Sequence, residues 1–324
     1  MMAATATTTA PVVLEPEAQA FCDATARPPF LYELGPEGAR AVLDDVQAAP
    51  IDKLPVDDHW VTVPAAVGDV RVRIVRPVGV ERELPVILYM HGGGWVIGNA
   101  DTHDRLVREL VVGTGAALAF VEYDRSPEAR YPVAIEQGYA TARWIVREGR
   151  AHGLDASRMA VAGDSVGGCM TAALTLMAAD RGDVTFVHQS MYYPVTDAGQ
   201  ATASYAQFAQ GYYLTAAAMA WFWDQYAPDA AMRAEPFCSP FAASDEALSK
   251  LPPALLMVDE ADVLRDEGEA YAARLRGAGV AVTALRVDGI IHDFMMLNPL
   301  AATHGTRVAV AQAIASLREA LGTA

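Results

Sequence analysis

The sequence predicts an α/β fold with an eight-stranded, mostly parallel sheet flanked by helices. β-prone apolar runs alternate with helical patterns along most of the chain, as expected for a parallel sheet covered on both faces. Two of the apolar runs lead directly into glycine-rich turns, at residues 91–95 and 163–168. The chain has 324 residues, 52% of them hydrophobic, so it can bury a large core.

The pattern of apolar runs predicts the order of the strands and helices. The first two strands flank Gly68-Asp69, which favours an antiparallel hairpin at one edge of the sheet. Strands are predicted at 59–63, 70–76, 86–90, 117–123, 159–162, 186–193, 254–258 and 282–287. Helices are predicted between the later strands and after the last one, at 103–112, 133–148, 169–180, 266–278 and 307–321.

Two regions do not follow this alternation, and we expect them to form a helical cap. Residues 12–55 would supply its N-terminal part, and an insertion at about 197–249 would interrupt the main domain, which spans 56–324. Residues 1–11 are rich in alanine and threonine and are expected to be disordered. The aromatic residues of the insertion suit the wall of an apolar pocket, although packing against the domain below is the favoured explanation for any single ring. The candidate pocket residues are Trp95, Tyr205, Phe208 and Tyr212.

The composition argues against several classes of partner. The formal charge of −16 repels nucleic acid, and no apolar run reaches the length of a membrane span, so we expect no membrane insertion. The first residues lack the basic start and apolar core of a secretory signal. Cys22, Cys169 and Cys238 are widely spaced and odd in number, which favours a reducing, cytoplasmic location over a disulfide framework.

The segment Gly163-Asp164-Ser165-Val166-Gly167 lies between a predicted strand and a predicted helix. This context indicates a nucleophile elbow, the tight turn that exposes the serine of α/β hydrolases. Glycines two residues either side of the serine avoid a clash in that turn. Glycine and serine also form ordinary loops, so the motif needs support from the rest of the chain.

Another apolar run leads into His91-Gly92-Gly93-Gly94-Trp95. Consecutive glycines leave backbone N–H groups uncovered, and such donors can stabilise the oxygen of a reacting carbonyl in an oxyanion hole. A flexible turn is the alternative interpretation, and the presence of the elbow argues against it.

The base and the acid of such a site should follow the serine in the chain. His292 follows the last predicted strand through a loop at 288–291, whereas His304 lies at the start of the last predicted helix. We therefore expect His292 to be the base. Asp259, Asp262 and Asp197 all follow strands at positions that suit the acid, and their spacing does not choose among them.

Four motifs in the same order resemble those of the hormone-sensitive-lipase-like esterases, also called bacterial esterase family IV. They are His91-Gly92-Gly93-Gly94-Trp95, Gly163-Asp164-Ser165-Val166-Gly167-Gly168, Asp262-Val263-Leu264-Arg265-Asp266-Glu267-Gly268 and Ile291-His292-Asp293-Phe294. The resemblance extends from about residue 55 to the C-terminus. It implies an α/β-hydrolase fold, Ser165 as nucleophile, Asp262 as acid and His292 as base. It also implies that the backbone N–H groups of Gly93, Gly94 and Val166 form the oxyanion hole.

The resemblance implies a serine carboxylesterase acting on small-molecule esters with short to medium acyl chains, without metal or organic cofactor. The same triad could instead serve an amidase, a lactonase or a deacetylase. A ligand receptor on this fold is the non-enzymatic alternative, and the presence of His292 argues against it. Members of the family often dimerise through their last strands and helices, so a homodimer is one expectation and a monomer another.

The chain departs from the usual family pattern at four positions. Asp124 stands where an arginine is common, Val166 replaces an alanine, Cys169 replaces an asparagine and Asp293 replaces a glycine. Cys169 follows Ser165 by about one helical turn and is expected to be a buried structural residue. If the Asp293 carboxylate faces the imidazole of His292, we expect it to favour the protonated ring and move the activity optimum to higher pH.

Overall fold

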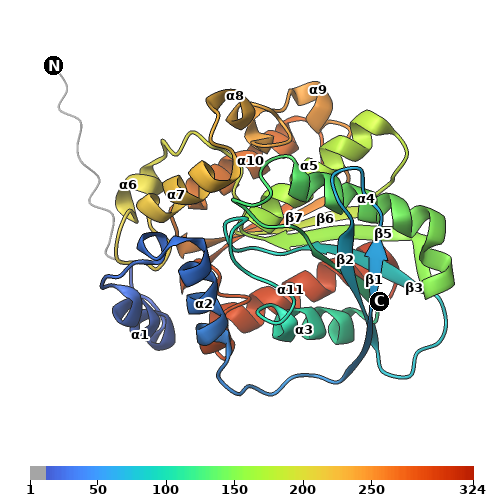
Figure 1. Cartoon of the computed structure of the whole chain (residues 1–324), viewed down its shortest axis with the longest axis horizontal. Coiled ribbons are helices and arrows are strands. Elements are labelled where there is room, and N and C mark those ends of the chain that lie inside the picture. Colours follow the sequence, from blue (N-terminus) through green and yellow to red (C-terminus); the bar gives the residue numbers. More distant parts are fainter. Residues whose placement is uncertain (1–11) are drawn as a thin grey trace.

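The computed structural model describes residues 12–324, so the expectation of disorder for residues 1–11 lies outside the described residues. Eight strands form a single sheet in the order β1-β2-β4-β3-β5-β6-β7-β8 (Figure 1). β1 and β2 pair antiparallel, β2 is also antiparallel to β4, and every later pair is parallel. The predicted fold class and the hairpin at the edge of the sheet are therefore confirmed.

Every predicted strand is present, and several are longer than predicted. The strands are β1 (Val56–Val63), β2 (Val70–Pro77), β3 (Leu84–Met90), β4 (Ala117–Glu122), β5 (Leu154–Asp164), β6 (His188–Tyr192), β7 (Ala254–Ala261) and β8 (Val282–Ile291). The expectation of a loop at 288–291 was wrong, because β8 continues to Ile291. Gly289 adopts a φ of +76°, and its N–H donates to the Glu260 carboxylate on β7 at 2.8 Å, which keeps the two strands together past an irregularity in the pairing.

Five long helices cover the two faces of the sheet. They are α3 (Asp104–Thr114), α4 (Val133–Glu148), α5 (Val166–Arg181), α10 (Arg265–Gly277) and α11 (His304–Leu321). In Figure 1, α3 and α11 lie below the sheet, whereas α4, α5 and α10 lie above it. The inner parallel strands β3, β4, β6 and β7 are buried almost throughout, which explains their continuous apolar sequences, whereas the edge strand β8 is partly exposed.

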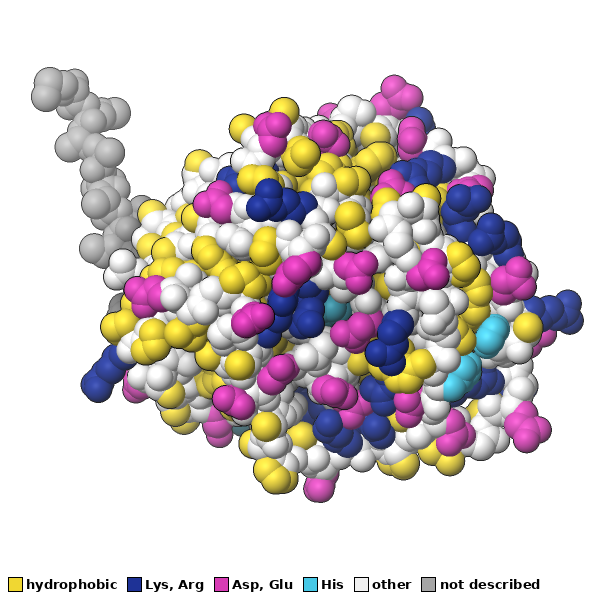
Figure 2. Space-filling view, viewed as in Figure 1, with side chains coloured by type: hydrophobic (Ala, Val, Ile, Leu, Met, Phe, Trp, Pro, Cys, Tyr) yellow, Lys and Arg dark blue, Asp and Glu magenta, His cyan; other side chains and the backbone are white. Residues whose placement is uncertain are grey.

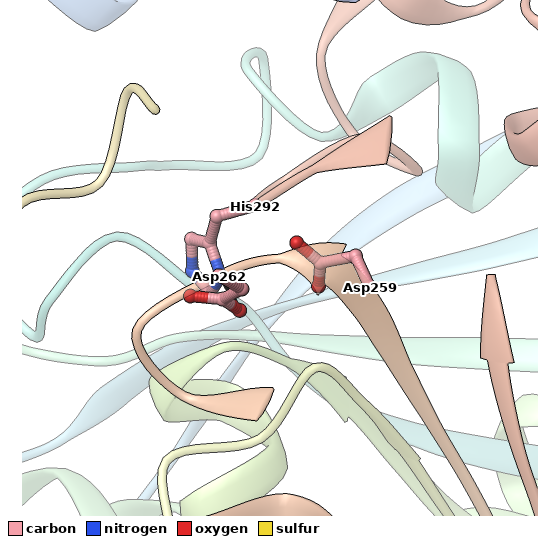
Figure 3. A group of neighbouring side chains, drawn as sticks. All are labelled: Asp259, Asp262 and His292. Carbon is pink, nitrogen blue, oxygen red and sulfur yellow. Dashed lines mark hydrogen bonds and ion pairs between the residues drawn. The ribbon is translucent and has the colours of Figure 1, made fainter. Parts of the chain in front are cut away.

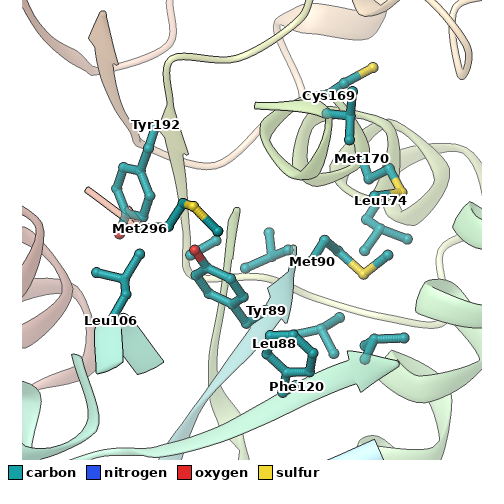
Figure 4. Close-up of a cluster of buried hydrophobic side chains, with 14 of the residues drawn as sticks. Leu88, Tyr89, Met90, Leu106, Phe120, Cys169, Met170, Leu174, Tyr192 and Met296 are labelled. Carbon is teal, nitrogen blue, oxygen red and sulfur yellow. The ribbon is translucent and has the colours of Figure 1, made fainter. Parts of the chain in front are cut away.

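The core lies on both faces of the central strand β3, whose residues are all buried. Figure 4 shows Met90 beside Met170 and Leu174 of α5, while Tyr89 points to the other side, towards Met296. Because successive side chains of a strand face opposite ways, this one strand joins the helices above and below the sheet.

The N-terminal segment and the insertion supply the remaining elements. They are α1 (Pro16–Thr25), the 3₁₀ turn η1 (Leu31–Glu33), α2 (Gly35–Gln47), α6 (Ala203–Gln207), α7 (Ala216–Tyr226), α8 (Ala230–Arg233), the 3₁₀ turn η3 (Pro240–Ala242) and α9 (Asp245–Leu248); two further 3₁₀ turns, η2 (Gly149–His152) and η4 (Asn298–Leu300), belong to the main domain. Phe21 of α1 packs edge-to-face on Tyr213, which precedes α7, with 5.1 Å between ring centroids. The two segments therefore meet at one end of the sheet (Figure 1).

The surface carries both signs of charge. On the face in Figure 2, acidic and basic side chains are interspersed, with hydrophobic side chains between them. Within residues 12–324, none of the helices combines the length and apolar character that crossing a bilayer requires.

Candidate active site

Ser165 stands at the sharp turn between β5 and α5. Its φ of +54° is unusual for a residue with a side chain, and such strain persists only where the surroundings enforce it. A Cβ atom on Gly163 would collide with Gly167, and a Cβ atom on Gly167 would collide with the carbonyl oxygen of Met90. The two glycines allow this turn because a side chain at either position would force the backbone apart.

The pairing of β7 with β8 brings Asp262 and His292 together. Ala261 is the partner of Ile291 in the parallel register, so the residue that follows each strand emerges at the same place. His292 Nδ1 lies 2.7 Å from Asp262 Oδ2, and its Nε2 lies 2.8 Å from Ser165 Oγ. All three residues are buried. Ser165, Asp262 and His292, for which the resemblance to the esterase family implied the roles of nucleophile, acid and base, thus form one continuous hydrogen-bonded row.

None of the other acids, nor the other histidine considered from the sequence, hydrogen-bonds to this row. The Asp197 carboxylate accepts a hydrogen bond from the Gly199 N–H at 2.9 Å, and His304 is exposed on α11. Asp259 is fully buried beside Asp262 and His292 (Figure 3). Among the described residues, neither of its carboxyl oxygens has a hydrogen-bond partner.

Three carboxyl groups surround the imidazole of His292. Burial disfavours the charged ring, but Asp262 and Asp293 outweigh burial and raise the pKa of His292 to about 10. Asp293 Oδ1 lies 3.4 Å from His292 Nε2. Burial also raises the pKa of Asp293, to about 6, and places the pKa of Asp259 well above its usual range, with the Asp262 carboxylate adding to the effect. The pKa values of His292, Asp293 and Asp259 are therefore all raised above their usual ranges.

The glycine turn after β3 lies beside Ser165. Gly93 and Gly94 have φ values of +102° and +60°, and both line the cavity that contains Ser165 and His292. A Cβ atom on Gly94 would overlap the ring of Phe222, which packs directly on this turn. Within residues 12–324, the backbone N–H groups of Gly93, Gly94 and Val166 donate to no backbone or side-chain acceptor, and Val166 is the first residue of α5. Free donors and the positive end of a helix dipole thus surround the serine.

A buried ion pair lies beside both glycine-rich turns, and no sequence motif predicted it. His103 Nε2 lies 3.2 Å from Asp164 Oδ2, and the Tyr89 hydroxyl donates to Asp164 Oδ1 at 2.7 Å. Burial opposes both charges, yet mutual attraction still raises the pKa of His103 and lowers that of Asp164. A Cβ atom on Gly92 would collide with Asp164. The pair joins Asp164, the residue before Ser165, to His103 at the start of α3, and Asp164 also lies against Gly92 of the glycine turn. In the sequence, only the position of Asp164 next to the serine pointed to it.

The cavity at Ser165 is mainly apolar, and its walls differ from those expected. Besides the site residues it is lined by Leu31 of η1, Ile97, Tyr213, Leu214, Ala218, Met219 and Phe222. The expected pocket residues Trp95, Tyr205, Phe208 and Tyr212 are not among the described residues that line this cavity. The sequence did not indicate that Tyr213 and Phe222 would be the aromatic residues of this cavity.

The four expected pocket residues pack elsewhere. The Trp95 ring is fully buried and stacks on Tyr226, with 4.0 Å between centroids and 3° between planes. Phe208 and Tyr212 pack edge-to-face on each other, and Tyr205 is buried. These rings hold the insertion together, which is the packing role considered as their alternative.

Asp259, Asp262 and His292 are residue types that bind metals, and their ligand atoms lie within 4.8 Å of one another. However, each nitrogen of His292 already contacts a partner, Asp262 at Nδ1 and Ser165 at Nε2. A metal would have to displace one of these contacts, so the donor set fits a proton-transfer row better than a metal centre.

Two of the departures from the family pattern have local partners. The Asp124 carboxylate accepts a hydrogen bond from the Gln137 side chain at 2.8 Å, and the neighbouring Arg125 donates to the Gly98 carbonyl at 2.9 Å, after the glycine turn. Cys169 is buried, and its thiol lies 3.4 Å from the Cys238 carbonyl oxygen. Burial raises the pKa of Cys169 well above its usual range, so the thiol stays neutral.

Comparisons with known proteins agree with the fold. A family model described as alpha/beta hydrolase fold matches residues 87–296. An ethyl acetate hydrolase of Pseudomonas putida is 40% identical over 232 residues, covering 71% of this chain and 72% of that protein. The carboxylesterase NlhH of Mycobacterium tuberculosis is 34% identical over 293 residues, covering 89% of this chain and 90% of that protein.

The solved structures give the same result. A thermostable esterase from Pseudomonas putida ECU1011 superimposes with a TM-score of 0.93 at 45% identity, covering 97% of this chain and 99% of that one. A fungal esterase from Rhizomucor miehei superimposes with a TM-score of 0.90 at 37% identity, covering 96% of this chain and 98% of that one. The chain therefore belongs to the alpha/beta hydrolase fold family, within the hormone-sensitive-lipase-like group of esterases.

Proposed function

We propose that this chain is a serine carboxylesterase that hydrolyses short- to medium-chain acyl esters through an acyl-enzyme on Ser165. The observation that carries the proposal is the row Ser165–His292–Asp262, with contacts of 2.8 and 2.7 Å, at the wall of an apolar cavity. This arrangement has the geometry of a nucleophile, a base and an orienting acid.

In the proposed reaction, His292 Nε2 takes the proton of Ser165 while Oγ attacks the ester carbonyl. The Asp262 carboxylate accepts a hydrogen bond from Nδ1–H, which keeps Nε2 free to act as the base. The carbonyl oxygen becomes negatively charged in the tetrahedral intermediate. The N–H groups of Gly93, Gly94 and Val166 would stabilise it, each by about 10²- to 10³-fold in rate.

The intermediate then collapses as the protonated His292 gives its proton to the leaving alcohol. The acyl group stays on Ser165 until water attacks by the same steps, with His292 again as base. Every proton in this cycle passes through His292, so no metal or organic cofactor is needed. The raised pKa of His292 means that the base becomes more available as pH rises.

The cap, the partners and the location are also proposals. The N-terminal segment and the insertion supply Leu31, Tyr213 and Phe222 to the cavity, which supports their role as a cap. The buried, free Cys22, Cys169 and Cys238 support a cytoplasmic location. The edge strand β8 has exposed positions and could pair in a homodimer, as family members often do.

The test is hydrolysis of p-nitrophenyl esters from acetate to palmitate, with chelator present, by the wild type and by Ser165→Ala. We expect turnover that peaks at short or medium chains and falls at least 10³-fold in the variant. Ser157→Ala, at an exposed serine, is the matched control and should keep full activity. A wild type inactive on every ester would instead favour an amidase or a receptor, and activity surviving Ser165→Ala would remove Ser165 as the nucleophile.

A further inference from the structure

The cavity at Ser165 is small for an esterase pocket. Its internal volume is about 50 Å³, between the glycine turn on one side and Tyr213, Met219 and Phe222 on the other. A single water needs roughly 10–15 Å³ on the same measure, so this space holds only a few non-hydrogen atoms. It can accept a small acyl group but not an extended chain.

A much larger cavity, of about 410 Å³, lies directly beside it. It is formed between residues 25–32 of the N-terminal segment and residues 209–217 of the insertion. Phe30 and Tyr32 line it and stack on each other, with 5.6 Å between ring centroids. Its walls are more apolar than polar, which suits a hydrocarbon chain.

Tyr213 is the residue that lines both cavities. Its φ of +67° is rare for an aromatic residue and carries a conformational cost, so the surrounding contacts must hold it there. Phe21 of α1 packs on one side of the ring, at 5.1 Å between centroids. On the inner side, burial and the Asp293 carboxylate raise the pKa of Tyr213 well above its usual range, so its hydroxyl keeps its proton.

We propose that Tyr213 is a specificity-determining residue that closes the acyl cavity at Ser165 and separates it from the outer cavity. The outer cavity is then a second apolar site that long acyl chains reach only when the ring of Tyr213 is absent. This inference rests on the proposed esterase function, because it assigns the chain-length limit of that same site. A ring that packs on Phe21 and lines the cavity together with Asp293 acts as a wall, so the limit is a property of the side chain rather than of the backbone.

The experiment compares kcat/KM for p-nitrophenyl acetate, butyrate, octanoate and decanoate in the wild type and in Tyr213→Ala. Each methylene that gains a buried site contributes roughly fourfold in binding. We therefore expect the octanoate-to-acetate ratio of kcat/KM to rise at least tenfold in Tyr213→Ala. Tyr213→Phe keeps the ring and should keep the wild-type ratio.

Tyr212→Ala is the matched control. Tyr212 is the adjacent tyrosine, packs on Phe208 and is not among the described residues that line either cavity. Its removal should leave the octanoate-to-acetate ratio within about twofold of the wild type. Phe21→Ala removes the support behind the Tyr213 ring without touching the inner cavity, and should move the ratio in the same direction as Tyr213→Ala.

The outcomes separate this inference from the proposed function. A wild type without esterase activity would refute the function itself. An active wild type whose ratio is unchanged in both Tyr213→Ala and Phe21→Ala would overturn the role of Tyr213 alone. An equal rise in Tyr212→Ala and Tyr213→Ala would also overturn it, because general loosening of the insertion would then explain the change. Should Tyr213→Ala fail to fold, Phe21→Ala carries the test.

Discussion

Asp293 Oδ1 lies 3.4 Å from His292 Nε2, the same nitrogen that contacts Ser165 Oγ at 2.8 Å. Asp262 occupies the other nitrogen of the ring, so carboxyl groups flank the imidazole on both sides. The pH effect expected from the sequence required the Asp293 carboxyl group to face the imidazole, and in the structure it does. Asp293 also has a positive φ, of 63°, a backbone conformation that glycine adopts without steric cost.

Asp293→Gly is expected to shift the acid limb of the pH profile of kcat/KM to lower pH. A neutral His292 is needed to accept the Ser165 proton, and the negative Asp293 favours the charged ring, so removing it lowers the pKa of His292. Since the pKa of Asp293 is about 6, the effect is present above that pH. We expect a shift of about one pH unit, measured with a short p-nitrophenyl ester.

Asp293→Asn is the control for this prediction, because it removes the charge and keeps the size of the side chain. It should reproduce the shift seen in Asp293→Gly. An unchanged profile in both variants would refute the electrostatic role of Asp293, and a shift in the glycine variant alone would point to the backbone instead.

Asp259→Asn is expected to stabilise the protein by an amount that grows as pH rises. Burial and the Asp262 carboxylate raise the pKa of Asp259 far above its unfolded value, so the folded chain keeps a proton that the unfolded chain releases above about pH 4. Wild-type stability therefore declines with rising pH through this group, and asparagine removes the decline. The difference should grow by up to about 1.4 kcal/mol per pH unit.

The measurement is urea unfolding of the wild type and Asp259→Asn at pH 5, 6.5 and 8. Asp52→Asn, at an exposed aspartate, serves as the control and should show a flat difference. If the stability difference between the wild type and Asp259→Asn does not change with pH, Asp259 does not keep its proton in the folded protein, and the prediction is wrong.

Gly167→Ala is expected to abolish activity and destabilise the fold by about 3 kcal/mol. The added Cβ would overlap the backbone carbonyl of Met90, and neither backbone can give way without moving β3 or the elbow that carries Ser165. Gly277→Ala is the control, because a Cβ there meets nothing within 4 Å and should stabilise α10 by up to about 1 kcal/mol. Thermal unfolding measures the stability of each variant, and ester turnover measures its activity. A Gly167→Ala variant as stable and as active as Gly277→Ala would contradict the close approach of Gly167 to the Met90 carbonyl oxygen.

The elements and the motif positions could be predicted from the sequence because they depend on local chemistry. The apolar run before Ser165 and its flanking glycines require a strand, a tight turn and a helix, and the alternation of elements requires a parallel sheet. Residues alone narrowed the base to His292, and the resemblance to the esterase family was needed to choose Asp262 over Asp259 and Asp197.

Tertiary structure decided the rest, because it depends on which distant residues pack together. The register that pairs Ala261 with Ile291 brings Asp262 to His292 and leaves Asp259 buried beside them without a partner among the described residues. Likewise, Trp95, Tyr205 and Tyr213 are all aromatic, yet of these three Tyr213 alone is among the described residues that line the cavity. It has a positive φ and packs on Phe21. The sequence by itself determined the fold and the chemical groups of the site, whereas strand register and the packing of the N-terminal segment on the insertion decided which side chains surround Ser165.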